Sequence, residues 1–126
     1  MTEPLDFAAP DLATRVESLP PGAVDRLPFG AVRLDAAGRV LVYSQAEARL
    51  SGYGDRPAVG LDFFAEIAPC MDQPGFRGRL AAGLASGRVQ AHFTWIGDFA
   101  DRERMLEVRL QGIPGGGCWI FLRRED

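Results

Sequence analysis

The chain has 126 residues, of which 47% are hydrophobic and 25% charged, and its formal net charge is −3. This length suits one compact domain with its own core. The acidic balance excludes nucleic acid and an anionic membrane as main partners, because both are recognised through basic patches. Residues 1–16 lack the pattern of a signal peptide, and no apolar run reaches the roughly 18 residues that cross a membrane. We therefore expect a cytoplasmic protein whose two cysteines, Cys70 and Cys118, are reduced.

The first 27 residues are rich in proline, aspartate and alanine and predict a helical cap that lies against the rest of the domain. Asp11 is placed to cap a short helix over residues 12–18, and the prolines at positions 20 and 21 end it. We accordingly divide this single domain into an N-terminal cap, residues 1–27, and a core, residues 28–126.

Two short β-type runs, residues 29–35 and 39–43, open the core. The turn between them ends at Gly38, which is free to adopt a positive φ. Ser44 is a good N-cap for a helix that Gly52 ends. Residues 53–70 are interrupted by glycines and prolines, so short helical turns and loops are expected there.

A further helix is predicted over residues 76–86, and three strands close the chain. Residues 89–99 alternate between an apolar face, which includes Trp95, and a polar face with His92 and Asp98. Residues 104–110 alternate in the same way, and residues 118–122 form the last strand after a turn at 114–117. This order predicts an α+β fold, with a five-stranded antiparallel sheet and helices packed on one face. It is also the order of the PAS fold, a sensor module.

Cys70 follows Ile67-Ala68-Pro69 in the loop region between short helices. The residue type alone favours an inert core cysteine, because free cysteines are among the most buried residues in proteins. The same interpretation applies with more force to Cys118, which lies on an alternating strand.

Tyr43, Glu47 and Ser51 recur at intervals of four and project from one side of their helix, within about 80° of each other. If that side faces inward, the carboxyl group lies among apolar neighbours and its pKa rises. Such a row could donate hydrogen bonds to a buried oxyanion. The alternative is an ordinary solvated helix face.

Other chemistries lack the residues that they need. His92 is the only histidine, and nothing in the sequence brings it to Cys70 as a nucleophilic pair would require. There is no phosphate-binding loop, dinucleotide fingerprint, HxxxH or CxxC pattern. We expect neither an enzyme nor a metal protein.

Four segments of the chain together resemble the photoactive yellow protein family. They are LPFGAVRLD at 27–35, GRVLVYSQAE at 38–47, GLDFFAEIAPC at 60–70 and CWIFLRR at 118–124. The match is collinear from about Phe7 to Arg124. The FF–IAPC segment combined with a tyrosine four residues before a glutamate is specific, and a generic PAS domain would not show it.

This resemblance implies a PAS-fold, blue-light photoreceptor with p-coumaric acid (4-hydroxycinnamic acid) held as a thioester on Cys70. Tyr43 and Glu47 match the family's donors to the phenolate oxygen, and Ser51 matches a supporting threonine. The backbone N–H of Cys70 would hold the thioester carbonyl. Light would drive trans–cis isomerisation, Glu47 would pass its proton to the phenolate, and the cap would loosen as the signal. The other residues expected at the chromophore are Tyr53, Ile67, Ala68, Pro69, Trp95, Gly97 and Phe99.

Several positions depart from the family pattern. Tyr53 stands where the family has a pocket-covering arginine, although Arg56 is near in the sequence. In the gating loop, Trp95, Gly97 and Asp101 replace a tyrosine, a phenylalanine and a methionine. Because that methionine speeds the return of the cis chromophore to trans, the resemblance implies slow dark recovery unless Met71 or Met105 reaches the ring.

The alternative is a PAS-type interaction or small-ligand sensor module that loads no chromophore. Colour separates the two hypotheses, because only the photoreceptor gains a visible band that requires Cys70. An enzyme with a Cys70 nucleophile would instead show turnover. We expect a monomer that signals to a downstream protein.

Overall fold

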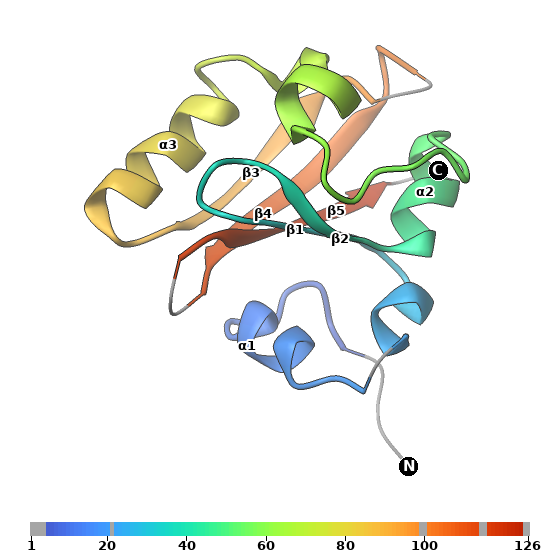
Figure 1. Cartoon of the computed structure of the whole chain (residues 1–126), viewed down its shortest axis with the longest axis horizontal. Helices are drawn as coiled ribbons and strands as arrows, with labels where there is room; N and C mark the ends of the chain where they lie inside the picture. The colour runs from blue at the N-terminus through green and yellow to red at the C-terminus, as the bar shows by residue number, and fades with distance from the viewer. Residues whose placement is uncertain (1–4, 21, 99–100, 114–115, 125–126) are drawn as a thin grey trace.

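The computed structural model describes residues 5–20, 22–98, 101–113 and 116–124. The order of elements is the predicted one, with two strands, a helical middle and three strands (Figure 1). The elements are α1 Leu12–Glu17, the 3-10 helix η1 Ala23–Arg26, β1 Gly30–Leu34, β2 Val40–Tyr43, α2 Gln45–Ser51, the π-helix η2 Phe63–Ile67, the 3-10 helix η3 Pro69–Met71, α3 Arg77–Ser86, β3 Gln90–Ile96, β4 Met105–Gly112 and β5 Cys118–Arg124. Among the described residues, no helix is long and apolar enough to span a membrane.

The five strands form one sheet in the order β2-β1-β5-β4-β3, and every neighbouring pair is antiparallel. The predicted sheet is therefore confirmed. Its last strand in sequence is its central strand, since β5 pairs with β1 from Leu34↔Cys118 to Gly30↔Leu122 and with β4 as far as Leu106↔Arg124. This extends β5 two residues beyond the predicted end.

The sheet is covered on both faces: helices pack on one face as predicted, and the predicted N-terminal cap lies on the other. Helices α2 and α3 lie on one side of it, and the N-terminal segment with α1 lies on the other (Figure 1). The reason is visible in β5, where residues 118–122 are all buried. Cys118, Ile120 and Leu122 pack in the helical core, whereas Trp119 and Phe121 pack against the N-terminal segment. A strand that is apolar at every position needs cover on both sides.

Capping was predicted correctly for one helix and wrongly for another. Ser44 Oγ accepts the backbone N–H of Glu47 at 3.1 Å, and α2 ends at Gly52 with φ +85°. Asp11 makes no capping hydrogen bond, because its carboxylate instead accepts from Arg15 Nε at 2.7 Å.

The alternation predicted for residues 89–99 stops before Asp98. Strand β3 ends at Ile96, and Gly97 has φ +134°, a conformation that favours glycine. The chain therefore turns, and Asp98 is buried instead of lying on the solvated face of the strand.

Buried polar side chains of β4 hold the N-terminal segment on the sheet. Arg109 Nη1 donates to the carbonyl oxygens of Phe7 and Ala9, both at 2.6 Å. Gln111 donates to the carbonyl of Pro10 at 3.0 Å and accepts from the N–H of Ala13 at 2.6 Å. These bonds join residues 7–13 to β4, and the boundary between cap and core at residue 27 stays a prediction.

Candidate functional site

The row of polar residues predicted around α2 faces the interior. Glu47 and Ser51 are buried, and Tyr43 at the end of β2 is partly buried. The Tyr43 hydroxyl lies 3.3 Å from Ser51 Oγ, which also accepts the N–H of Tyr53 at 3.1 Å. The alternative of a solvated helix face is therefore wrong.

Tyr43 is a hydrogen-bond donor whose proton is hard to remove. Burial raises its pKa above the ordinary range, and the negative charge of Glu47 raises it further. Its ring lies 5.3 Å from the ring of Tyr53. The hydroxyl is consequently neutral at physiological pH and available to donate.

Glu47 is held by a residue that sequence reasoning missed. Arg124 donates from Nη1 and Nη2 to the two carboxylate oxygens of Glu47, both at 2.8 Å. The same guanidinium donates to Asp98, from Nε at 2.6 Å and from Nη2 at 3.0 Å. Period-two alternation could have indicated Arg124, since it shares the face of Ile120 and Leu122 on β5.

Burial and charge act in opposite directions on Glu47. Burial raises the pKa of its carboxyl group and the charge of Asp98 adds to this, whereas the hydrogen bonds and charge of Arg124 lower it. Burial would lower the pKa of Arg124, but its bonds to the two carboxylates keep it raised. Arg124 is therefore charged throughout the accessible pH range.

Gly30 on β1 makes room for this carboxyl group. A Cβ built at position 30 would lie 1.8 Å from Glu47 Oε1 and 3.1 Å from Glu47 Cβ. Sequence analysis treated Gly30 only as part of a strand. No sequence signal points to this role, because it depends on the approach of α2 to β1.

Cys70 lies on η3 and is partly buried, with a free thiol. It borders a cavity of about 570 Å³ that Ile67, Pro69, Gly97 and Asp98 also line. Burial raises the pKa of the thiol, and a hydrogen bond from its own backbone N–H offsets this only in part. Acylation by an activated carboxylic acid needs the thiolate, so the raised pKa makes Cys70 slower to react at neutral pH, and the reaction speeds up as the pH rises.

Gly97 lines the same cavity, and Trp95 lies close to it on β3. A Cβ at Gly97 would lie 3.9 Å from Cys70 Cβ and 3.6 Å from Trp95 Nε1, so the glycine leaves space between them. The indole N–H of Trp95 is buried and has no hydrogen-bond partner in the described part of the chain. Ala68 is buried beside the cysteine segment. Phe99 lies outside the described residues.

The positions that depart from the family pattern have definite surroundings. Tyr53 is buried and donates from its hydroxyl to the carbonyl of Pro57 at 2.7 Å. The guanidinium carbon of Arg56 lies 5.8 Å from the Tyr53 ring centroid, so a cation does stand beside this ring. Met71 is buried in the core, whereas Met105 and Asp101 are exposed.

Asp98 connects the cysteine with the α2 row, because it lines the cavity at Cys70 and accepts from the arginine that holds Glu47. Tyr43 borders a separate cavity of about 690 Å³, together with Arg56 and Ala58. The two cavities therefore share no lining residue. Glu47 lines neither of them and is joined to Asp98 through Arg124.

Two other features do not contribute to this site. His92 is exposed and pairs with Glu107 at 2.5 Å, and Cys70 is not its partner.

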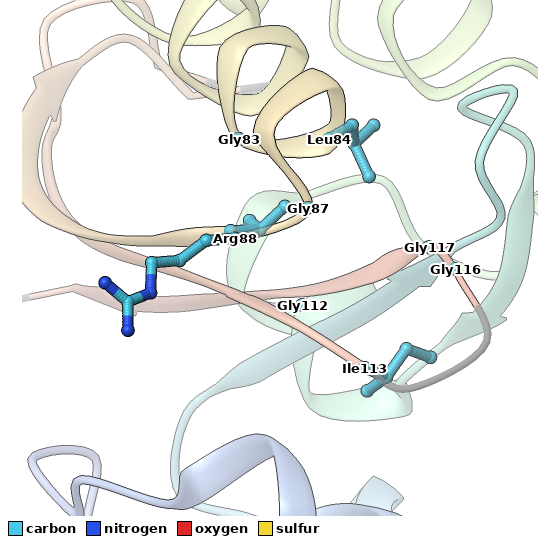
Figure 2. Close-up of a pocket in the computed structure, with 9 residues that line it drawn as sticks. Gly83, Leu84, Gly87, Arg88, Gly112, Ile113, Gly116 and Gly117 are labelled. Atoms are coloured by element: carbon cyan, nitrogen blue, oxygen red, sulfur yellow. The ribbon is translucent and has the colours of Figure 1, made fainter.

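A glycine-rich cavity of about 470 Å³ lies between the end of α3 and the β4–β5 turn (Figure 2). Gly83 serves internal packing there, since a Cβ at this position would lie 3.0 Å from Val89 Cα. The described residues contain no cluster of three or more potential metal ligands.

Comparisons with known proteins agree on the architecture. A family model described as PAS fold matches residues 24–120. The photoactive yellow protein of Rhodothalassium salexigens is 33% identical over 97% of this chain and 98% of that protein, and the one of Rhodobacter capsulatus is 33% identical over 82% and 85%. The photoactive yellow protein domain of the sensor histidine kinase Ppr from Rhodospirillum centenum has a TM-score of 0.79 at 33% identity, covering 88% of this chain and 98% of that one. A PAS domain from Colwellia psychrerythraea, at 16% identity and a TM-score of 0.59, shares the fold alone.

Proposed function

The chain belongs to the photoactive yellow protein family of PAS-fold proteins, and from this premise we propose that it is a blue-light photoreceptor carrying p-coumaric acid as a thioester on Cys70. It is a sensor module and not an enzyme. The observation that carries the proposal is the position of Cys70, a partly buried free thiol at the edge of a cavity.

The residues present fit such a group at the attachment end. The cavity of about 570 Å³ falls within the range of small-molecule sites, roughly 300–1,000 Å³. Its walls are mixed: Ile67 and Pro69 are apolar, whereas Asp98 and Arg102 are charged. Gly97 leaves space beside the thiol. The bound group would supply a phenolic oxygen and a double bond that light isomerises.

The α2 row would supply the donors that a phenolate oxygen needs, because a charge in a low-dielectric interior is costly without them. Tyr43 borders a different cavity from Cys70, so the bound group would have to extend from one toward the other. Tyr43 donates through a hydroxyl that Ser51 positions. Glu47 donates only when its carboxyl group is protonated, and its present partner, Arg124, must then be satisfied elsewhere.

We further propose that loss of the Glu47 proton is the event that loosens the N-terminal cap. Arg123 and Arg124 are consecutive on β5 and therefore point to opposite faces of the sheet. Arg124 contacts Glu47, while the guanidinium carbon of Arg123 lies 4.7 Å from the ring centroid of Phe7 in the cap. A shift of the end of β5 would therefore change both the contact with Glu47 and the contact with the cap. The solved relative from a sensor histidine kinase suggests a signalling protein as the partner.

Reconstitution tests the attachment. The purified chain is mixed with an activated p-coumarate, and the Cys70 sulfur displaces the activating group, which leaves as the thiol proton is lost. We expect a visible absorption band and one acyl adduct by mass in the wild type and in Cys118→Ala, since Cys118 is fully buried. Cys70→Ala should give neither. A wild type without band or adduct would instead favour a PAS interaction module that loads no chromophore.

A further inference from the structure

The guanidinium of Arg124 lies between two buried carboxylates from distant parts of the chain. Its side chain is 3% exposed, and those of Glu47 and Asp98 are 4% and 1% exposed. Four hydrogen bonds of 2.6 to 3.0 Å join the three groups. The planar fork of an arginine suits this double, bidentate arrangement, whereas a lysine would offer a single point charge.

We propose that Arg124 is a positioning residue that decides whether Glu47 is a carboxylate or a proton donor, and that Asp98 retains Arg124 when Glu47 becomes neutral. Both oxygens of Glu47 accept hydrogen bonds from Arg124, and this bidentate contact favours the ionised carboxylate. Burial acts against it and leaves the pKa of Glu47 raised overall, so the contact with Arg124 is what opposes protonation.

The charges around Glu47 allow both protonation states. With Glu47 ionised, the buried set of Arg124, Glu47 and Asp98 carries a net charge of −1. Arg104 neutralises this charge, because its Nη1 lies 3.4 Å from Asp98 Oδ2. With Glu47 protonated, Arg124 and Asp98 form a neutral pair, and Arg104 gives the same four groups a net charge of +1. Among the described residues, the other titratable group that acts on Glu47 is Tyr43 on β2, which stays neutral.

The consequence for the chromophore rests on the proposed function. A carboxylate accepts hydrogen bonds but has none to donate, so a site that uses Glu47 as a donor must protonate it. Burial favours the protonated form of Glu47 and Arg124 opposes it. Release of Glu47 by Arg124, with Asp98 keeping its two bonds, is therefore the step that prepares this residue for its donor role.

The test follows the titration of Glu47 in the chromophore-free chain by NMR of ¹³C-labelled glutamate carboxyls, with Glu47→Gln assigning the signal. In Arg124→Gln we expect the Glu47 midpoint to rise by at least about one pH unit, since an opposite charge in contact lowers a carboxyl pKa by about 1–3 units. Arg124→Lys should give an intermediate midpoint. The matched control is Arg123→Gln, because Arg123 contacts Glu107 on the other face and should leave the midpoint unchanged.

A second variant keeps the test decisive if Arg124→Gln does not fold. Asp98→Asn removes a negative charge and leaves Arg124 to Glu47, so the midpoint should fall. A merely structural role for the cluster would not move the midpoint in opposite directions in the two variants. An unchanged midpoint in Arg124→Gln, or a raised one in Asp98→Asn, overturns the proposal.

The titration and the reconstitution fail independently. No chromophore is needed for the Glu47 midpoint, so a chain that refuses p-coumarate but shows the expected shifts refutes the proposed function and supports the role of Arg124. A chain that forms the adduct without the shifts gives the reverse conclusion.

Discussion

Gly30 and Glu47 show how closely the site is packed at the scale of single residues. The carboxyl group of Glu47 occupies the space that any side chain at position 30 would need. The carboxyl group cannot move aside freely, because Arg124 holds both of its oxygens. A glycine in a strand, usually a weak strand former, is here required by a side chain from the following helix.

We therefore expect Gly30→Ala to destabilise the chain by about 1–3 kcal/mol, the usual cost of overpacking a core. Urea unfolding followed by circular dichroism measures the change. In a Glu47→Ala background the same substitution should cost less, because the carboxylate that it displaces is gone. An equal cost in both backgrounds would show that the clash with Glu47 is not the cause.

At the scale of elements, β5 is the central strand, and its side chains pack in the apolar clusters on both faces of the sheet. It lies between β1 and β4 and is buried on both faces from Cys118 to Leu122. Burial raises the pKa of the Cys118 thiol to about 12. The thiol therefore stays protonated in the native state at a pH where the unfolded chain releases its proton.

This shift predicts a loss of stability in alkali with a definite sign. The native pKa of about 12 lies above the unfolded value of 9.0. The contribution of the Cys118 thiol to the free energy of unfolding is therefore complete below pH 9.0 and is lost as the pH rises through the native pKa. The loss is roughly 1.4 kcal/mol per pH unit in that window. Urea unfolding at several pH values should show the wild type losing stability faster than Cys118→Ala above pH 9.0. Parallel pH profiles would contradict this.

The elements themselves were largely predictable. The strands β1, β2 and β4, the N-cap at Ser44 and the stop at Gly52 follow from alternation and capping, which act over a few residues. The failed cap at Asp11 and the burial of Asp98 arise where an ion pair or a glycine turn competes with the local pattern.

At the scale of the whole molecule, the N-terminal cap is attached to the sheet through hydrogen bonds and apolar contacts. Arg109 is buried and its two bonds reach the backbone of Phe7 and Ala9 across about a hundred residues of sequence. The cap also packs apolar side chains, including Leu12, against Trp119 and Phe121.

Arg109→Gln should loosen the cap without unfolding the sheet. Hydrogen bonds to charged groups contribute about 1.5–3 kcal/mol each, so opening of residues 5–20 should become at least about tenfold more frequent. Hydrogen exchange followed by mass spectrometry measures this segment against the strands. Arg15→Gln is the control, because Arg15 is an exposed cap residue that pairs with Asp11 one helical turn away. Equal exchange of residues 5–20 in both variants would show that Arg109 does not hold the cap on the sheet.

The sequence by itself determined the succession of elements, the strand alternation and the approximate position of the polar row, because those signals lie within a few residues of one another. It also located Cys70 through its neighbours in the IAPC segment. Only the tertiary structure decided that both faces of the sheet are covered and that Glu47 meets Arg124. Those two residues are 77 positions apart, and they meet because the last strand inserts between the first and the fourth. A long-range pairing of this kind has no local signal in the sequence.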